Sequence, residues 1–183
     1  MKLKTSDLKN KNLLIYGLGT TGKSVLRYFR KKKFKQYSVW DDDNCIRKSN
    51  KIKITRKRFI KNIDKYDYII ISPGINLKQQ LSNKTLNKIS NKVITDLDLF
   101  FLQNKKVKTI AITGTNGKST TCKILEHVLK KNKKKVNLCG NIGRPILDQK
   151  IYINSNVIIE LSSFQLFYSK FLKLDISMIL KLK

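Results

Sequence analysis

The chain has 183 residues, of which 40 are Lys or Arg and 12 are Asp or Glu, so its formal net charge is +28. This length accommodates one large or two small domains with a real hydrophobic core, and no stretch approaches the roughly 20 apolar residues of a membrane span. The three cysteines have no CxxC or metal-ligand spacing, which excludes a disulfide framework and a cysteine metal site and predicts a reduced, cytoplasmic protein.

A charge this high raises the hypothesis of a nucleic-acid-binding protein, because clustered Lys and Arg side chains neutralise phosphates. The excess is almost all lysine and is spread through every segment, in runs such as those at 31–33 and 130–135. That distribution favours solvated surfaces, so no nucleic-acid partner is predicted. The alternative would require lysines gathered on one face with exposed aromatic side chains between them. The positive charge would also help to attract anionic substrates.

Strand-like and helical patterns alternate along the chain, which is typical of parallel sheets in an α/β fold. In the first part, strands are expected near residues 13–16, 37–40, 52–55, 68–72 and 93–95, and helices near 24–32 and 79–89. A polar QNKK linker at 103–106 precedes further strands near 107–113, 136–139, 157–161 and 176–180. We therefore predict two domains, at residues 1–104 and 105–183.

The first expected strand runs into a glycine-rich turn, and an apolar helical face follows it. The glycines form a GxGxxG pattern at Gly17, Gly19 and Gly22, and the next strand ends at Asp41. This arrangement is Rossmann-like, and the acid lies close to the ~20-residue offset of a ribose-binding carboxylate. The pattern alone leaves the ligand open, with NAD(P) as the ordinary interpretation.

The strand of residues 68–72 ends in Ser72, Pro73 and Gly74. Open α/β sheets bind ligands at the carboxyl ends of their strands, so this turn is a candidate for ligand contact. An ordinary strand-ending turn explains the same residues equally well.

A second glycine turn, TGTNGKST, separates the strand near 107–113 from a helical pattern that contains Ile124, Leu125, Val128 and Leu129. Its two glycines, Gly114 and Gly117, allow a tight turn whose N–H groups and helix N-terminus point at an anion. Lys118 would reach the β- and γ-phosphates of a nucleotide, and Ser119 would offer a hydroxyl to Mg²⁺. An ordinary strand-to-helix turn is the alternative, but the strand before and the helix after favour a phosphate loop.

Glu160 ends the apolar strand near 157–161. An acid at the carboxyl end of a strand beside a phosphate loop is a candidate Mg²⁺ ligand, and a surface carboxylate is the even alternative. A phosphate loop directly after a Rossmann-like domain is unusual for a dehydrogenase, so the first glycine turn is expected to hold a nucleotide diphosphate other than NAD(P).

Four segments together resemble the Mur ligases, specifically the UDP-N-acetylmuramoyl-L-alanine:D-glutamate ligases. They are YGLGTTGKS at 16–24, ISPGI at 71–75, AITGTNGKST at 111–120, and the pair GNIGRPIL at 140–147 and ELSSFQL at 160–166. TGTNGK alone would also suit folylpolyglutamate synthase, which lacks the preceding glycine-rich domain. The resemblance implies a Rossmann-like UDP-substrate-binding domain at 1–104 and the first part of an ATP-binding central domain at 105–183.

The resemblance also implies roles for individual residues. Lys118 and Glu160 would be catalytic, Ser119 and Glu160 would bind metal, and Mg²⁺ and ATP would be the cofactors. ATP would be bound by Gly114, Thr115, Asn116, Gly117, Lys118, Ser119 and Thr120. The UDP substrate would be bound by Gly19, Thr20, Thr21, Asp41, Ser72, Pro73, Gly74, Asn141, Ser162 and Gln165. Asp42 and Asp43 depart from the family pattern, and their extra carboxylates would repel a diphosphate.

The implied reaction joins D-glutamate to UDP-N-acetylmuramoyl-L-alanine through an acyl phosphate, as a step of peptidoglycan precursor synthesis. No position matches the family's later metal ligands, adenine-binding residues or D-glutamate-binding domain, so the sequence is expected to be C-terminally truncated and inactive alone. A nucleotide-binding remnant without catalysis, or one half of a split ligase whose C-terminal half is separate, remains the alternative.

Overall fold

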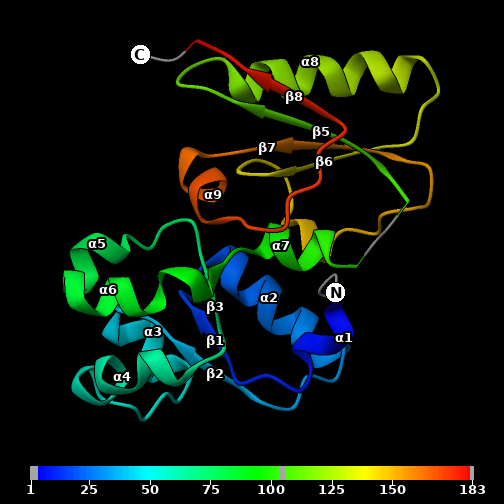
Figure 1. Ribbon diagram of the computed structural model, residues 1–183. Helices are drawn as coiled ribbons and strands as arrows, with labels where there is room; N and C mark the ends of the chain where they lie inside the picture. Colours follow the sequence, from blue (N-terminus) through cyan, green and yellow to red (C-terminus); the bar gives the residue numbers. More distant parts are fainter. Residues whose placement is uncertain (1–3, 104–105, 182–183) are drawn as a thin grey trace. The chain divides into compact units, whose positions relative to one another are not determined.

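The computed structural model describes residues 4–103 and 106–181, and it divides the chain into two compact units, Met1–Asp96 and Leu97–Lys183. Each unit is built on a parallel four-stranded sheet with helices packed on it, which confirms the α/β fold (Figure 1). The division falls before the expected boundary at residue 104, because the helix that starts at Asp96 packs into the second unit's core. Of the expected linker at 103–106, residues 104 and 105 lie outside the described residues.

The first unit's sheet has the strand order β2-β1-β3-β4. Its strands are β1 (Leu13–Tyr16), β2 (Tyr37–Trp40), β3 (Tyr68–Ile71) and β4 (Val93–Ile94). Helix α1 (Thr5–Leu8) precedes β1, and between the strands lie α2 (Thr20–Lys31), α3 (Asn44–Ser49), α4 (Arg56–Asn62), η1 (Ile63–Lys65), α5 (Leu77–Gln80), α6 (Asn83–Ile89) and η2 (Ser90–Lys92). Because neighbouring strands are parallel, the loops that follow β1, β2 and β3 meet at one edge.

Aromatic side chains form the core on both faces of this sheet, because successive strand residues point to opposite sides. On the α2 side, Phe29 lies edge-to-face with Tyr37 of β2, at 5.3 Å between ring centroids. On the α4 side, the Phe59 ring stacks on Trp40 at 4.2 Å and meets the edge of Tyr16 at 5.3 Å. All of these rings but Tyr37 are buried, so the two faces hold the strand ends in place.

Three sequence-based expectations for this unit were wrong in detail. Residues 52–55 form no strand; they lead into α4, where the Thr55 hydroxyl accepts a hydrogen bond from Arg58 N. The expected helix at 79–89 is two helices, since Leu81 is extended and Ser82 caps the start of α6. The expected helix at 24–32 already begins at Thr20, directly after the glycine turn.

The second unit's sheet has the order β6-β7-β5-β8, again with parallel strands. Its strands are β5 (Lys108–Thr113), β6 (Val136–Gly140), β7 (Asn156–Glu160) and β8 (Ile176–Ile179). Its helices are α7 (Asp96–Phe101), α8 (Lys118–Lys131), η3 (Ile146–Asp148) and α9 (Ser163–Tyr168). All four expected strands are therefore present, within a residue of their expected limits.

Alternation along β7 decides which side chains face α8. Val157 and Ile159 join the cluster formed with α7, whereas Ile158 packs with Ile112 and Cys122 on the α8 side. Glu160 lies two residues after Ile158 and so points to the same side as α8. On that helix Leu125 and Leu129 pack against the sheet, while Ile124 and Val128 are exposed.

Candidate functional site

The phosphate-loop segment lies between the end of β5 at Thr113 and the start of α8 at Lys118. Both of its glycines have positive φ, 137° at Gly114 and 80° at Gly117, which is a conformation that other residues adopt only with strain. Gly117 is the N-cap of α8, and a helix leaves its first N–H groups without an intrahelical acceptor. The start of α8 therefore combines amide donors that have no intrahelical acceptor with the positive end of a helix dipole.

The segment after β8 supports this loop, a contact that the sequence analysis did not foresee. A Cβ on Gly114 would lie 2.8 Å from both Leu180 Cβ and Leu180 O, so no larger residue fits. Thr115 N donates to Lys181 O at 3.1 Å, and Leu180 N donates to Thr113 O at 2.8 Å. The shape of the loop thus depends on a strand that lies far away in the sequence.

The ammonium group of Lys118 folds over the loop itself. Its Nζ donates to Gly114 O at 2.6 Å and to Thr115 O at 3.1 Å. Both acceptors are neutral carbonyl groups, so a phosphate placed over the loop would offer the ammonium a stronger partner. The ammonium group is therefore held at the loop between β5 and α8.

Ser119 and Glu160, the two candidate metal ligands, are in direct contact. The Ser119 hydroxyl donates to Glu160 Oε2 at 2.7 Å, and Asn141 Nδ2 lies 3.4 Å from Oε1. Glu160 is only 2% exposed, and its main-chain oxygen accepts from Asn141 N at 2.9 Å. Gly140 allows this approach, because a Cβ there would lie 2.2 Å from Glu160 O. The structure therefore brings Ser119, Glu160 and Asn141 together.

The charge of Glu160 affects a neighbouring thiol. Burial, together with a smaller effect of the Glu160 carboxylate, raises the pKa of Cys122, one turn along α8, to about 11. The thiol is consequently neutral at physiological pH and acts as a small apolar group beneath Ile112 and Ile158.

Ser162 and Gln165, expected to contact substrate, also build the start of α9. The Ser162 hydroxyl accepts from Gln165 N at 3.1 Å, while Gln165 Oε1 accepts from Ser162 N at 3.2 Å. This reciprocal capping box fixes the turn that follows β7. Gln165 is 1% exposed, so its structural role is clear, and a substrate contact stays a prediction for both residues.

In the first unit, the glycine turn after β1 is packed tightly against α2 and the end of β3. Gly17 has a φ of 94°, and a Cβ on Gly22 would lie 1.7 Å from Gly17 O. The Ser72 hydroxyl donates to that same oxygen at 2.8 Å. Gly19 caps α2, and the space where its Cβ would lie is open.

The remaining expected ligand-binding residues of this unit lie at the same edge of the sheet. Thr20 and Thr21 form the first turn of α2, and Pro73 and Gly74 follow β3 directly. The structure therefore gathers the expected UDP-binding residues of the first unit at the carboxyl ends of β1, β2 and β3.

Asp41 organises the main chain at this edge. Its carboxylate accepts from Leu18 N at 2.6 Å and from Asp43 N at 2.8 Å, and the residue is 6% exposed. Each oxygen already has an amide donor, so the side chain holds the glycine turn and the start of the next loop in position. A direct contact with a ribose stays a prediction.

The two extra acids have partners of their own. Asp42 accepts from the Tyr16 hydroxyl at 2.6 Å and forms an ion pair with Arg56 at 2.6 Å. Asp43 caps α3, because its Oδ1 accepts from Cys45 N at 2.7 Å. With one acid paired to Arg56 and the other bonded to helix amides, the expected repulsion of a diphosphate is much reduced.

Two arginines that the sequence analysis missed complete this corner. Arg56 also donates to Gln80 O at 3.0 Å, and Arg47 donates to both Asp41 O and Asp42 O. The Arg47 guanidinium lies over the Trp40 ring, 4.7 Å from its centroid. In the sequence, only the two extra acids, Asp42 and Asp43, indicated that cations would lie nearby to compensate their charge.

Two features, a metal-binding cluster and a membrane-spanning helix, are absent from residues 4–103 and 106–181. No group of three or more His, Cys, Asp or Glu side chains in these ranges is placed to hold a metal ion. Nor does any helix in them have the length and apolar character needed to cross a membrane.

Comparison with known proteins identifies the domains of this chain. Residues 11–94 match the model of the Mur ligase MurD-like N-terminal domain, and residues 112–183 match the Mur ligase middle domain. A UDP-N-acetylmuramoylalanine--D-glutamate ligase of Wolbachia pipientis wMel is 33% identical over 98% of this chain and 36% of its own length. Proteins of the same name from the Wolbachia of Brugia malayi and from Rickettsia prowazekii are 37% and 35% identical, over 90% and 95% of this chain.

The chain spans between 34% and 39% of the length of these three relatives, and both matched domains occur in the order that the Mur ligases have. Since the two domain models together match residues 11–94 and 112–183, the chain belongs to the Mur ligase family.

Proposed function

We propose that this chain binds the two nucleotide substrates of an ATP-dependent amide ligase that joins D-glutamate to UDP-N-acetylmuramoyl-L-alanine. The relatives carry the name of that activity, and peptidoglycan precursor synthesis is the corresponding process. The first unit would bind the UDP substrate and the second unit ATP. An ATP-consuming ligase of this kind would act in the cytoplasm.

The observation that carries the proposal is the contact between Ser119 and Glu160 at the N-terminus of α8. A hydroxyl and a buried carboxylate, 2.7 Å apart at the start of α8, are hard oxygen ligands next to the expected place of the phosphates. Burying a carboxylate is costly without a compensating charge, and the Ser119 and Asn141 groups that contact Glu160 are neutral, so a bound metal ion would supply that charge.

The residues present fit Mg²⁺ as the metal of this site. Ser119 Oγ and the Glu160 carboxylate would hold it, with Asn141 orienting the carboxylate through Oε1. When bound, the metal would neutralise phosphate charge as the γ-phosphoryl group is transferred. Magnesium usually retains several waters and takes only one or two protein ligands, so a small ligand set is sufficient.

In the proposed reaction the substrate's alanyl carboxylate attacks the γ-phosphorus of ATP, and the bond to the bridging oxygen breaks to release ADP. The resulting acyl phosphate is then attacked by the amine of D-glutamate, which forms the amide and releases phosphate. Lys118 and the loop amides would stabilise the charge on the transferred group, a task of positioning and electrostatics that needs no side-chain nucleophile. Gly114 to Thr120 would enclose the phosphates.

In the first unit, the proposal assigns the UDP diphosphate to the N-terminus of α2. Gly19, Thr20 and Thr21 would supply donors there, with Ser72, Pro73 and Gly74 forming the neighbouring wall. Asp41 would act by holding the glycine turn, since its carboxylate is already bonded to two amides. Asn141, Ser162 and Gln165 are proposed for the muramoyl end of the same substrate.

The test is calorimetric titration of Mg·ATP into the chain and into Lys118→Met, which removes the ammonium and keeps most of the aliphatic stem. Loss of a charge-assisted contact to phosphate should weaken binding about tenfold or more. Lys123→Met is the matched control, because Lys123 lies exposed on the same helix. Equal affinities for Lys118→Met and Lys123→Met would contradict the proposal.

A further inference from the structure

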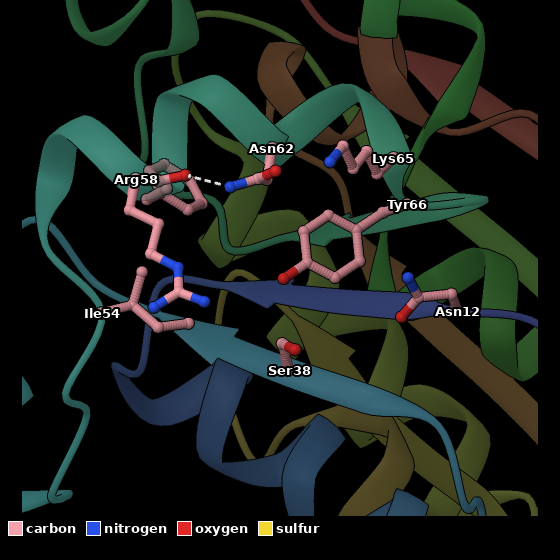
Figure 2. A pocket seen from close by; sticks show the side chains of 8 residues that line it. Asn12, Ser38, Ile54, Arg58, Asn62, Lys65 and Tyr66 are labelled. Carbon is pink, nitrogen blue, oxygen red and sulfur yellow. Dashed lines mark hydrogen bonds between the residues drawn. The ribbon is translucent and has the colours of Figure 1, made fainter.

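A cavity of about 280 Å³ lies in the first unit, away from the proposed nucleotide site. Two of its lining residues, Asn12 and Tyr66, precede β1 and β3, so the cavity is at the amino ends of the strands. The glycine turn and Ser72 are at the opposite, carboxyl ends. The lining consists of Asn12, Ser38, Ile54, Arg58, Phe59, Asn62, Lys65 and Tyr66 (Figure 2).

The cavity follows from the side-chain sizes on β2. Ser38 and Trp40 alternate with Val39, so both point to the α4 face of the sheet. Trp40 is covered by the stacked ring of Phe59, but Ser38 is too small to reach the helix. Strand β2 is also at the edge of its sheet, so none of the described strands closes this space from the side.

Cationic and hydroxyl groups converge on the cavity. In Figure 2 the Arg58 guanidinium and the Tyr66 hydroxyl point into the same space, above Ser38. No hydrogen bond joins the Arg58 guanidinium or the Lys65 ammonium to another of the described residues, whereas Asn62 Nδ2 is held by Arg58 O at 2.7 Å. The lining therefore offers donors that have no partner of their own.

No carboxylate lines the cavity, and both charged residues in the lining are cations. The two acids that flank Lys65 and Tyr66 in sequence have other partners: Asp67 accepts a hydrogen bond from Asn12 N at 2.8 Å, and Asp64 forms an ion pair with Lys88 at 3.8 Å. Arg58 and Lys65 would repel a cationic ligand, and their unpaired donors would gain from an anion. The apolar parts of the lining, Ile54, Phe59 and the Tyr66 ring, suit a flat carbon skeleton.

We propose that this cavity is a second binding site, for a small organic phosphate with a planar apolar part. The phosphate would lie against the Arg58 guanidinium, whose fork of donors matches phosphate oxygens, with Ser38 and Tyr66 as further donors. The ring would pack between Phe59 and Tyr66. At about 280 Å³ the cavity is just below the usual range of ligand pockets, roughly 300–1,000 Å³, so the ligand is a small one.

Phenyl phosphate is a suitable probe, titrated into the full chain at constant ionic strength and followed by NMR chemical shifts. Arg58→Met should weaken its binding about tenfold, since a charge-assisted contact is lost. Lys57→Met is the matched control: it removes the same charge from an exposed neighbour on α4 that does not line the cavity. Equal weakening in both variants would show diffuse attraction to a basic surface and would overturn the proposal.

Two further arms test the location and the ligand class. Ser38→Leu fills the cavity and should abolish phenyl phosphate binding, with thermal unfolding used to verify the fold. Phenol and inorganic phosphate should each bind more weakly than phenyl phosphate, because each satisfies only half of the site. Excess UDP should leave the shifts unchanged. Displacement by UDP would place the probe at the glycine turn, and unchanged binding in Ser38→Leu would likewise sink the inference.

Discussion

The Ser119 hydroxyl donates a 2.7 Å hydrogen bond to Glu160 Oε2, joining the first turn of α8 to the end of β7 across 41 residues of sequence. This contact arises because β5 and β7 are parallel neighbours, with Ile112 opposite Glu160. The loop after β5 and the last residue of β7 therefore meet at one edge. The hydrogen bond from Ser119 fixes the buried Glu160 carboxylate beside the phosphate loop.

Ser119→Ala and Glu160→Gln should each weaken Mg·ATP binding by about tenfold, because one oxygen ligand or its charge is lost. When a chelator removes Mg²⁺, the affinities of the variants and of the parent for ATP should differ much less. Ser163→Ala, an exposed serine at the start of α9, is the control. If Ser119→Ala bound Mg·ATP as tightly as Ser163→Ala, the metal assignment would be wrong.

Gly22→Ala should destabilise the first unit by about 2 to 3 kcal/mol, since overpacking at a rigid contact forces the backbone to shift. The added Cβ would lie 1.7 Å from Gly17 O, a main-chain atom that cannot move aside cheaply. Gly74→Ala is the control, because the space around a Cβ there is open. Chemical denaturation measures both, and similar midpoints for the two variants would refute the packing described for the glycine turn.

The three thiols should differ strongly in reactivity. Cys45 is exposed, whereas Cys122 and Cys139 are buried, and the raised pKa of Cys122 keeps it protonated. Because the thiolate is the reactive form, a thiol reagent at pH 8 should label one cysteine quickly, and Cys45→Ser should remove that phase. Fast labelling of Cys122 in the folded chain, located by mass spectrometry, would contradict the packing of α8.

Cys122 also predicts a pH dependence of stability. The pKa is raised from 9.0 to about 11 on folding, so its contribution is complete below pH 9 and is lost as the pH rises through about 11. Across that window the unfolded thiol ionises while the folded one does not, and the free energy of unfolding should fall. Cys122→Ala should flatten this part of the profile, and an unchanged slope would count against the assignment.

UDP-N-acetylmuramoyl-L-alanine should bind the chain more tightly than NADH. A ribose-binding acid must offer an accepting oxygen to the nucleotide, but both oxygens of Asp41 already accept from main-chain amides and the residue is 6% exposed. Competition between the two ligands, followed by NADH fluorescence, measures the preference. Tighter binding of NADH would overturn the assignment of the first unit.

Local patterns determined the fold class, the glycine turns and the family of this protein. Strand-like runs that end in glycine and lead into an apolar helical face define each strand-turn-helix unit within about 15 residues of sequence. Gly114 and Gly117 adopt positive φ because the turn demands it, and Glu160 ends a buried strand that its composition alone predicted. These features depend on neighbours in sequence, so a single chain is sufficient to identify them.

Tertiary structure decided what depends on distant residues. A strand was expected at 52–55, but those residues pair with none of the described strands. Asp42 was expected to repel a diphosphate, but it forms an ion pair with Arg56. Position 114 requires glycine partly because Leu180 packs over it. The cavity under α4 exists because Ser38 is small where Trp40 is large. Pairing, charge compensation and packing act between segments far apart in sequence, which no local pattern contains.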